Sequence, residues 1–413
     1  MIEQFFWIIS LFTLFLGVFW IQVFLARESN NRKPIKNFPK VSVIVPAKNE
    51  EKTLAKTINS LLKINYPKDK LQIIIVNDGS TDNTEKVAKS LINKNPSFEM
   101  LLVNRRANGS SRKAAALNFG LKFVNGEFVA CLDSDTYVSQ NSLKRMLAHF
   151  EDRNVGSVIS GIRVINPDNI YGKIQRLEYI FTTFIRSLMS KIGTLHITPG
   201  ALSLYRTEVL KKMGGFDENS LTEDFEIAMK LRYNHYLIKM EPRSITYTSV
   251  PDSFGSFWNQ RVRWFRGFIE TSMKYKHMLG NKNYGILGIF QYPVNILSFL
   301  IILTAFSFLS YEFFQRIYRF FIKLFMLKFG YLDLVKIPDL KEVILTMNIK
   351  LIFPIIISFI FGFYIYLLAH KFSNEKLKYP FSIVVFFTVY PILRSLHWVT
   401  ATYKEIKKSE KNW

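Results

Sequence analysis

An apolar run near the start of the chain constrains the fold more than any other feature. Residues 5–26 contain no charged side chain, and as a helix they would measure about 33 Å, enough to cross a hydrocarbon layer of about 30 Å. A cleavable signal peptide would carry basic residues before its apolar core. Here the only charge before the run is Glu3, and the basic residues follow it: Arg27, Arg32, Lys33 and Lys36. The positive-inside rule therefore predicts a retained anchor over residues 1–27, with the chain that follows in the cytoplasm.

A second apolar region covers residues 284–401. Its candidate membrane spans are residues 284–311, 351–369 and 380–393, the last extending to residue 401. Residues 313–329 differ, because Arg and Lys recur among Phe, Leu and Ile at helical spacing. This pattern predicts an amphipathic helix that lies in the membrane interface.

The number of crossings is left open by these spans. Three crossings after a cytoplasmic domain would place the basic tail, residues 402–413, outside the cell, against the positive-inside rule. Either residues 284–311, which contain Pro293, do not cross fully, or the tail is an exception. The first alternative is favoured. In both, the protein is expected to be a multi-pass cell-membrane protein.

The middle of the chain, from residue 38 to residue 276, has the sequence pattern of a soluble α/β domain. Short β-rich apolar runs at residues 41–45, 71–76, 100–103 and 128–132 alternate with helical patterns at residues 52–62, 83–92 and 112–123. Alternation at this spacing predicts parallel strands in a doubly wound sheet. Ligands in such sheets bind at the carboxyl ends of the strands.

The net charge of +23 restricts the partners. No nucleic-acid reader motif accompanies it, so a nucleic-acid partner is not expected. Most of the excess is assigned to membrane boundaries that face anionic lipid, and a share to a nucleotide diphosphate. The single cysteine, Cys131, excludes an intramolecular disulfide and a cysteine-cluster metal site. Its apolar surroundings predict a buried core residue.

Two acidic motifs follow predicted strands. Asp78 lies in an Asn-Asp-Gly-Ser sequence. This sequence either forms a simple turn or presents the Asp78 carboxylate as a hydrogen-bond acceptor for the base or ribose of a nucleoside. Asp133 and Asp135 lie directly beyond a strand, where two carboxylates at i and i+2 point into one crevice. Hard oxygen ligands of this kind suit Mg²⁺ or Mn²⁺ on a diphosphate.

Two further motifs open or occupy helices. Thr222-Glu223-Asp224 begins a helical pattern at residues 225–232, so Thr222 is expected at the N-cap, and Asp224 could act as a general base. In the predicted helix 256–273, Gln260, Arg263 and Trp264 share one face. An arginine can clamp a diphosphate and a tryptophan can stack on a sugar. The competing interpretation is an interfacial amphipathic helix.

In this order, the four motifs resemble those of the processive family 2 glycosyltransferases, the group that includes cellulose, hyaluronan, chitin and poly-β-1,6-N-acetylglucosamine synthases. The resemblance covers residues 40–270 closely, and Thr-Glu-Asp followed by Gln-Arg-x-Arg-Trp is its most specific part. It implies a GT-A-like α/β domain over residues 38–276, with a mostly parallel, doubly wound sheet flanked by transmembrane helices. The single amino-terminal anchor and the length of 413 residues look most like the bacterial poly-N-acetylglucosamine synthases.

The resemblance also implies roles for individual residues. Pro46, Glu50 and Asp78 would bind the uridine of the donor, and Lys113 and Asp133 would approach its sugar and diphosphate.

For the transfer step, Asp135 together with Asp133 would hold Mg²⁺ or Mn²⁺, and Asp224 would be the base. The diphosphate and the acceptor would be held by Gln260, Arg261, Arg263 and Trp264.

The chain departs from the family pattern at two places. Relatives usually have Gly immediately before the lysine, where this chain has Arg112, which puts the local backbone in doubt. Pro199-Gly200 falls where relatives shape the acceptor end, with Pro in place of a small polar residue.

The leading functional hypothesis is an inverting hexosyltransferase that transfers a sugar from a UDP-sugar to a growing β-linked polysaccharide, with an accessory membrane subunit as a candidate partner. The alternative is a single transfer to a membrane lipid such as ceramide, diacylglycerol or a polyprenol phosphate. A catalytically silent scaffold is disfavoured, because it predicts decay in at least one motif and none is seen.

Overall fold

The computed structural model describes residues 2–26, 37–106, 113–165, 167–326 and 349–410. Contacts divide the chain into two compact units. The first comprises Met1–Ala26 and Val294–Leu368, and the second Arg27–Pro293 and Ala369–Trp413. The expected C-terminal membrane region, residues 284–401, is thus divided between them.

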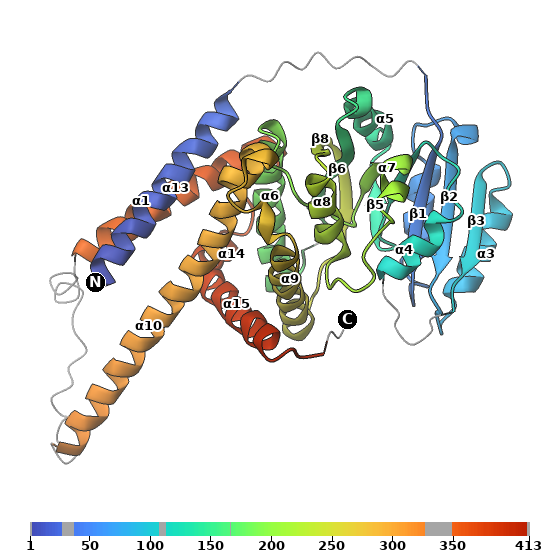
Figure 1. Cartoon of the computed structure of the whole chain (residues 1–413). Coiled ribbons are helices and arrows are strands. Elements are labelled where there is room, and N and C mark those ends of the chain that lie inside the picture. The colour runs from blue at the N-terminus through green and yellow to red at the C-terminus, as the bar shows by residue number, and fades with distance from the viewer. Residues whose placement is uncertain (1, 27–36, 107–112, 166, 327–348, 411–413) are drawn as a thin grey trace. The chain divides into compact units, whose positions relative to one another are not determined.

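The second unit contains an eight-stranded sheet of order β3-β2-β1-β4-β7-β6-β8-β5 (Figure 1). The strands are β1 Val41–Ala47, β2 Leu71–Asn77, β3 Glu99–Asn104, β4 Phe128–Cys131, β5 Thr136–Val138, β6 Val155–Val164, β7 Ser203–Arg206 and β8 Leu237–Thr248. β1 to β4 pair in parallel, as predicted. β6 and β8 also pair in parallel. β7 pairs antiparallel with both β4 and β6, and β5 antiparallel with β8, so the sheet is mixed.

β1, β2 and β4 are buried on both faces. In β1, neighbouring residues enter different cores. Val43 and Val45 pack with Leu54 and Ile58 of α2, whereas Ile44 packs with Ala116 and Leu117 of α4. This explains the continuous apolar runs in the sequence. The helices that accompany the parallel strands are α2 Leu54–Leu62, α3 Thr84–Lys94 and α4 Lys113–Leu121.

The remaining helices of this unit include two from the C-terminal end of the chain. They are α5 Ser142–Leu147, α6 Ile170–Lys191, α7 Thr207–Lys212, α8 Glu223–Tyr233, α9 Phe254–Lys274, α14 Pro380–Thr388 and α15 Tyr390–Ile406. α15 packs along α9, where the rings of Phe265 and Trp398 stack 4.0 Å apart. Arg266 of α9 donates to Glu405 at 2.5 Å and to the Ser409 carbonyl at 2.8 Å.

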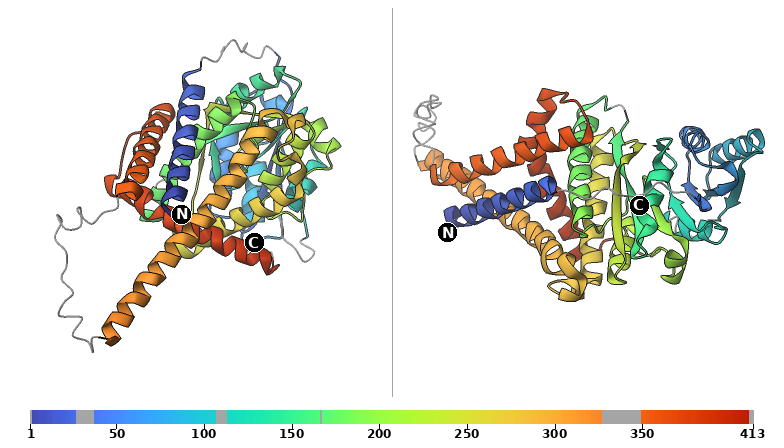
Figure 2. Two further views of the ribbon diagram at one scale, coloured as in Figure 1. Left: turned by 60° about the vertical axis from the view of Figure 1, so that its left-hand side comes forward. Right: turned by 90° about the horizontal axis from the view of Figure 1, so that it is seen from above.

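The first unit is formed by apolar helices, of which α10 begins and α13 ends in the second unit. α1 is Ile2–Leu25, α13 is Ile349–Ser373, and α10, Tyr292–Met326, follows a π-helical stretch at Leu287–Gln291 (Figure 2). Three helices in the described part of the chain are long and apolar enough to cross a membrane: Gln4–Leu25, Leu287–Met326 and Ile355–Ser373. α14 and α15 pass this test only as a pair, and they are bent by 44°.

The separate amphipathic helix expected at residues 313–329 is not an element of its own. Its described part, up to Met326, continues α10 without a break. The reason is that no Gly or Pro occurs between Pro293 and Met326, so no residue interrupts the helix there. Residues 327–329 lie outside the described residues.

Candidate active site

Two predicted site residues lie where β4 ends. The backbone N–H of Leu132 donates to the Ile44 carbonyl of β1, and the N–H of Asp133 donates to the Gly200 carbonyl at 3.0 Å. These bonds fix the turn that carries Asp133 and Asp135 at the carboxyl edge of the sheet. Cys131, just before the turn, is buried as predicted.

Lys113, the first residue of α4, connects the two acidic motifs. Its ammonium pairs with Asp133 and, at 3.1 Å, with Glu223 of α8. Burial alone would lower the pKa of Lys113, but these carboxylates raise it well above its usual value. The lysine is therefore charged, and it brings the end of β4 and the start of α8 into one site.

Gly200 leaves the space that this ion pair occupies. A Cβ atom at position 200 would lie 2.2 Å from the Lys113 ammonium and 2.7 Å from a carboxylate oxygen of Asp133. Any side chain there would displace both groups. The Pro199-Gly200 pair, which was expected to shape the acceptor end, therefore lies beside Lys113 and Asp133, the residues expected to approach the donor. Arg112, the other departure from the family pattern, lies outside the described residues.

Asp224 lies in the first turn of α8, beside the same lysine. Its carboxylate accepts from the N–H of Phe225 at 2.8 Å, and its carbonyl accepts from the Thr198 hydroxyl at 2.7 Å. Burial, together with the Glu223 charge, raises the pKa of Asp224 to about 6 against the opposing charges of Lys113 and Arg263. Such a carboxylate is charged at neutral pH and more basic than an exposed Asp.

Thr222 occupies the N-cap position of α8, as predicted, but its side chain makes no capping hydrogen bond. Its hydroxyl is buried without a partner among the described residues. A Cβ atom on Gly267 of α9 would lie 2.2 Å from that hydroxyl oxygen. The two helices therefore meet at this point, and α9 takes the space beside the cap.

Asp135 lies among other acids. Burial raises its pKa to about 6, and the charges of Asp133 and Glu50 contribute further. An acidic cluster of this kind favours a bound cation, and carboxylate oxygens suit Mg²⁺ or Mn²⁺. In the described residues, no group of three or more His, Cys, Asp or Glu side chains could hold a metal ion.

The predicted nucleoside residues lie at the ends of β1 and β2. Asp78 follows β2, its N–H donates to the Ala47 carbonyl at 2.9 Å, and its carboxylate pairs with Arg105. Pro46 lies in β1 opposite Val76. Glu50 follows β1, and its charge reaches Asp135.

Arg105 was not among the predicted site residues. It follows β3, so its position after a third parallel strand was the available signal.

The residues of the Gln-Arg-x-Arg-Trp motif divide between two faces of α9. Gln260, Arg263 and Trp264 are half-buried. The guanidinium of Arg263 donates a hydrogen bond to the Leu221 carbonyl at 3.4 Å. Its charge also acts on Asp224.

The Arg261 side chain is 1% exposed. It pairs with Glu178 of α6 at 2.5 Å and lies over the Trp264 ring, 4.2 Å from its centroid. Its guanidinium therefore ties α9 to α6.

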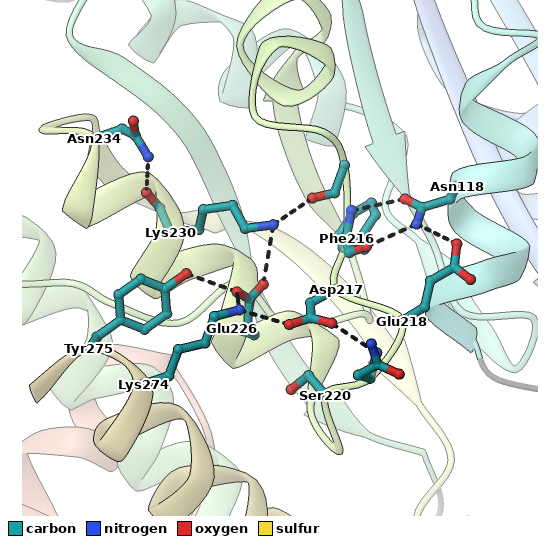
Figure 3. Close-up of polar contacts among 12 residues, drawn as sticks. Asn118, Phe216, Asp217, Glu218, Ser220, Glu226, Lys230, Asn234, Lys274 and Tyr275 are labelled. Atoms are coloured by element: carbon teal, nitrogen blue, oxygen red, sulfur yellow. Dashed lines mark hydrogen bonds and ion pairs between the residues drawn. The ribbon is translucent and has the colours of Figure 1, made fainter.

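A polar network holds the loop that leads into Thr222 (Figure 3). The Asn118 side chain of α4 donates to the Phe216 carbonyl at 2.9 Å and accepts from its N–H at 2.8 Å. Lys274 of α9 pairs with Asp217 at 2.7 Å and with buried Glu226 of α8 at 2.5 Å. Side chains of α4, α8 and α9 thus bind one loop, and this fixes the position of Lys113 relative to Asp224.

Comparisons with known proteins agree with this architecture. Residues 42–214 match the sequence profile of glycosyl transferase family 2. The chain is 32% identical over 277 residues to a poly-beta-1,6-N-acetyl-D-glucosamine synthase of Staphylococcus epidermidis, covering 64% of this chain and 65% of the relative. It is 31% identical over 283 residues to the synthase of the same name from Staphylococcus aureus, covering 66% and 67%. The chain thus matches about two thirds of the length of these relatives.

A solved structure shares the fold. It is a mannosyltransferase from Pyrobaculum calidifontis in complex with GDP-Man and Mn²⁺, which is similar over 99% of this chain and 100% of its own, with a TM-score of 0.66 and 16% identity. The family and the GT-A-like fold expected from the sequence are therefore confirmed, and most strand pairings are parallel, as expected. The chain belongs to glycosyltransferase family 2 and folds its catalytic unit as a GT-A domain.

Proposed function

We propose that the protein is a membrane polysaccharide synthase that transfers a sugar, with N-acetylglucosamine as the first candidate, from a UDP-sugar to a growing β-linked chain. The two staphylococcal relatives, named as poly-beta-1,6-N-acetyl-D-glucosamine synthases, support the choice of polymer. The observation that carries the proposal is the Lys113 ion pair with Asp133 and Glu223, since it unites the donor edge of the sheet with the helix of the base.

The donor is proposed to bind across the carboxyl ends of β1, β2 and β4. Pro46, Glu50 and Asp78 would hold the uridine, while Lys113 and Asp133 would hold the sugar diphosphate. Arg105, which pairs with Asp78, keeps that carboxylate in place.

Asp133 and Asp135 are the proposed ligands of Mg²⁺ or Mn²⁺. The fit rests on their oxygen donors and on the crowding of negative charge around Asp135. A similar fold solved with Mn²⁺ is in agreement. When bound, such an ion offsets the negative charge that grows on the departing diphosphate.

Transfer is proposed as an inverting single displacement. The acceptor hydroxyl gives its proton to Asp224 as its oxygen forms a bond to the anomeric carbon of the α-linked donor. The bond from that carbon to the diphosphate oxygen breaks, and UDP leaves with the electron pair. Lys113 and Arg263 face the developing charge. Attack from the opposite side gives a β-linkage.

Gln260 and Trp264, on the half-buried face of α9, are proposed to hold the acceptor. Arg261, although placed in the same motif, is proposed to act by fixing that face through Glu178. An accessory membrane subunit remains a candidate partner.

The protein is proposed to be a multi-pass cell-membrane protein with its catalytic unit in the cytoplasm. The apolar helices α1, α10 and α13 support the membrane location. The basic flank after residue 26 supports the orientation.

The variant Asp224→Asn tests the mechanism. It should reduce sugar transfer by at least about a thousandfold, because the amide cannot take the proton, and it should leave UDP affinity within about twofold. Transfer is measured with radiolabelled UDP-N-acetylglucosamine and UDP affinity by calorimetry, both on the purified full chain. The control is Asp69→Asn, the same exchange at an exposed residue just before β2. Loss of UDP binding together with transfer, or retained transfer, would contradict the assigned role.

A further inference from the structure

A cavity of about 300 Å³ lies in the second unit, between β6, β8, α6 and the end of α13. Its wall is apolar, formed by Ile162, Ile180, Ile245 and Phe372. Its remaining side chains include three arginines, Arg145, Arg163 and Arg243, with Glu375 as the lining carboxylate. An apolar wall with a basic rim suits a ligand that joins hydrocarbon to an anionic group.

The arginines are only partly neutralised by neighbouring carboxylates. Arg145 is exposed, donates to the Arg243 carbonyl at 2.6 Å, and makes no ion pair with any residue that the structure describes. Arg163 shares Glu375 with Arg176, at 3.2 Å and 2.5 Å, so two cations face one anion. Arg243 pairs with Glu241 through Nε only, and its side chain is 70% exposed. The rim therefore keeps a net positive charge of about two, with guanidinium N–H groups free for a phosphate.

The cavity adjoins the end of a candidate membrane span. The span Ile355–Ser373 ends with Phe372 and Ser373, and both line the cavity. The chain then continues through Asn374 and Glu375, which also line it, while Lys376 and Lys378 beside them are exposed. Basic residues directly after an apolar span lie at the level of lipid headgroups, and on the cytoplasmic side they face anionic lipid.

We propose that this cavity binds the headgroup of an anionic phospholipid. The phosphate would contact Arg145 and Arg243 at the rim, and the glycerol and the first methylenes of the acyl chains would lie against Phe372, Ile180 and Ile245. The occupied cavity would join the last turn of α13 to β6 and β8 of the catalytic unit. The proposal does not depend on which sugar is transferred or to which acceptor.

Lipid binding is tested on the purified full chain in nanodiscs of phosphatidylcholine. Phosphatidylglycerol is added in small amounts, and the lipid retained after exchange into detergent is quantified by mass spectrometry. Wild type should retain phosphatidylglycerol over phosphatidylcholine. The double variant Arg145→Ala/Arg243→Ala should bind phosphatidylglycerol roughly thirtyfold more weakly, since each arginine near the membrane surface contributes about fivefold. Arg145→Lys/Arg243→Lys should keep most of the affinity, because the charge remains.

A matched control removes two charges elsewhere. Arg153→Ala/Lys86→Ala changes exposed basic residues of the same unit that do not line the cavity, and its retention should equal that of wild type. Equal loss in the control would reduce the effect to overall charge and overturn the proposal. Retention unchanged in Arg145→Ala/Arg243→Ala would do the same. Displacement of the lipid by inorganic phosphate at equal concentration would assign the cavity to free phosphate instead.

A measurement on wild type covers the case in which the alanine variant does not fold. A phosphatidylglycerol with a photoreactive group at the start of one acyl chain should label the peptide that contains Phe372 or the peptide that contains Ile180. Phosphatidylcholine with the same group should label them at least about tenfold less. Equal labelling by both lipids, or labelling confined to other peptides, would contradict a headgroup site here.

Discussion

Single residues set the protonation state of the site. Lys113 stands between Asp133 and Glu223, and its charge opposes the rise in the pKa of both Asp135 and Asp224. The two aspartates nevertheless have pKa values of about 6, because burial and neighbouring carboxylates disfavour their charged forms. Both are proposed to act as carboxylates, so both must lose a proton before transfer.

A pH dependence follows from these values. Transfer should be at its plateau above pH 7 and should fall as the pH falls through about 6, where Asp224 and Asp135 become protonated. Since two groups must be charged, kcat/KM should fall by up to a hundredfold per pH unit well below 6. The measurement is the initial rate at low donor concentration between pH 5 and pH 8, with protein integrity checked at each pH. A rate that stays level down to pH 5 would contradict the assigned protonation states.

The partners of the buried charges could not be predicted from the sequence. Asp78 and Arg105 are 27 residues apart, and Glu178 and Arg261 are 83 apart. Each pair depends on two elements that meet only in the folded chain. The motif residues could be proposed from the sequence, because they follow strands or open a helix, which are local features. What the local pattern could not tell is that Arg261 faces inward while Arg263 faces the site.

At the scale of elements, α9 holds the site by its contacts on several sides. Gly267 packs against Thr222 of α8, Lys274 binds Glu226, and Arg261 binds Glu178 of α6. It also packs against α15, through Phe265 with Trp398 and Arg266 with Glu405. The position of Arg263 and Trp264 therefore depends on ion pairs that are distant from the chemistry.

Breaking the Arg261 ion pair tests this dependence. Glu178→Ala leaves a buried guanidinium without its carboxylate, which should destabilise the protein by about 3–5 kcal/mol. The double variant Glu178→Leu/Arg261→Met removes both charges and should recover most of that loss. The measurement is thermal unfolding in detergent. The control is Glu85→Ala, which breaks a surface ion pair with Lys89 and should leave the unfolding temperature close to that of wild type.

Activity of the double variant separates the two roles of Arg261. If Arg261 positions α9, transfer by Glu178→Leu/Arg261→Met should remain within about tenfold of wild type. A loss as large as that of Asp224→Asn, in a variant that unfolds at the wild-type temperature, would instead place Arg261 on the substrate.

The parallel half of the sheet could be predicted almost residue by residue. Predicted strands at 41–45 and 71–76 correspond to β1 and β2, and the predicted helix 256–273 corresponds to α9. β6, β7, β8 and α6 were not predicted. Their order in the sheet is not their order in the chain, and β7 is a four-residue strand inserted antiparallel between β4 and β6, so its register is set by long-range pairing.

At the scale of the whole molecule, the membrane topology depends on whether α14 and α15 together cross the membrane. α15 packs on α9 of the catalytic unit and is bent by 44° from α14, so we propose that this pair does not cross the membrane. Crossings by α1, α10 and α13 would then return the chain to the cytoplasm, and the basic tail would obey the positive-inside rule. This differs from the alternative favoured by sequence, in which residues 284–311 fail to cross.

Cysteine accessibility tests this topology, and the single native Cys131 simplifies it. In a Cys131→Ser background, Asp333→Cys should react with a membrane-impermeant maleimide in intact cells, whereas Glu410→Cys should react only after permeabilisation. Cells expressing the cysteine-free background provide the control. Labelling of Glu410→Cys in intact cells would place the tail outside and contradict a non-crossing α14–α15 pair.

Product sizing tests most directly whether this chain extends a polysaccharide, as proposed. Purified membranes containing the protein, or the variant Asp224→Asn, are incubated with UDP-N-acetylglucosamine and Mg²⁺ or Mn²⁺, and the products are sized. Wild type should give a ladder or high polymer that is sensitive to a β-specific glucosaminidase, and the variant should give none. A discrete lipid-linked monosaccharide from wild type would contradict polymer synthesis and would assign the protein to transfer onto a membrane lipid.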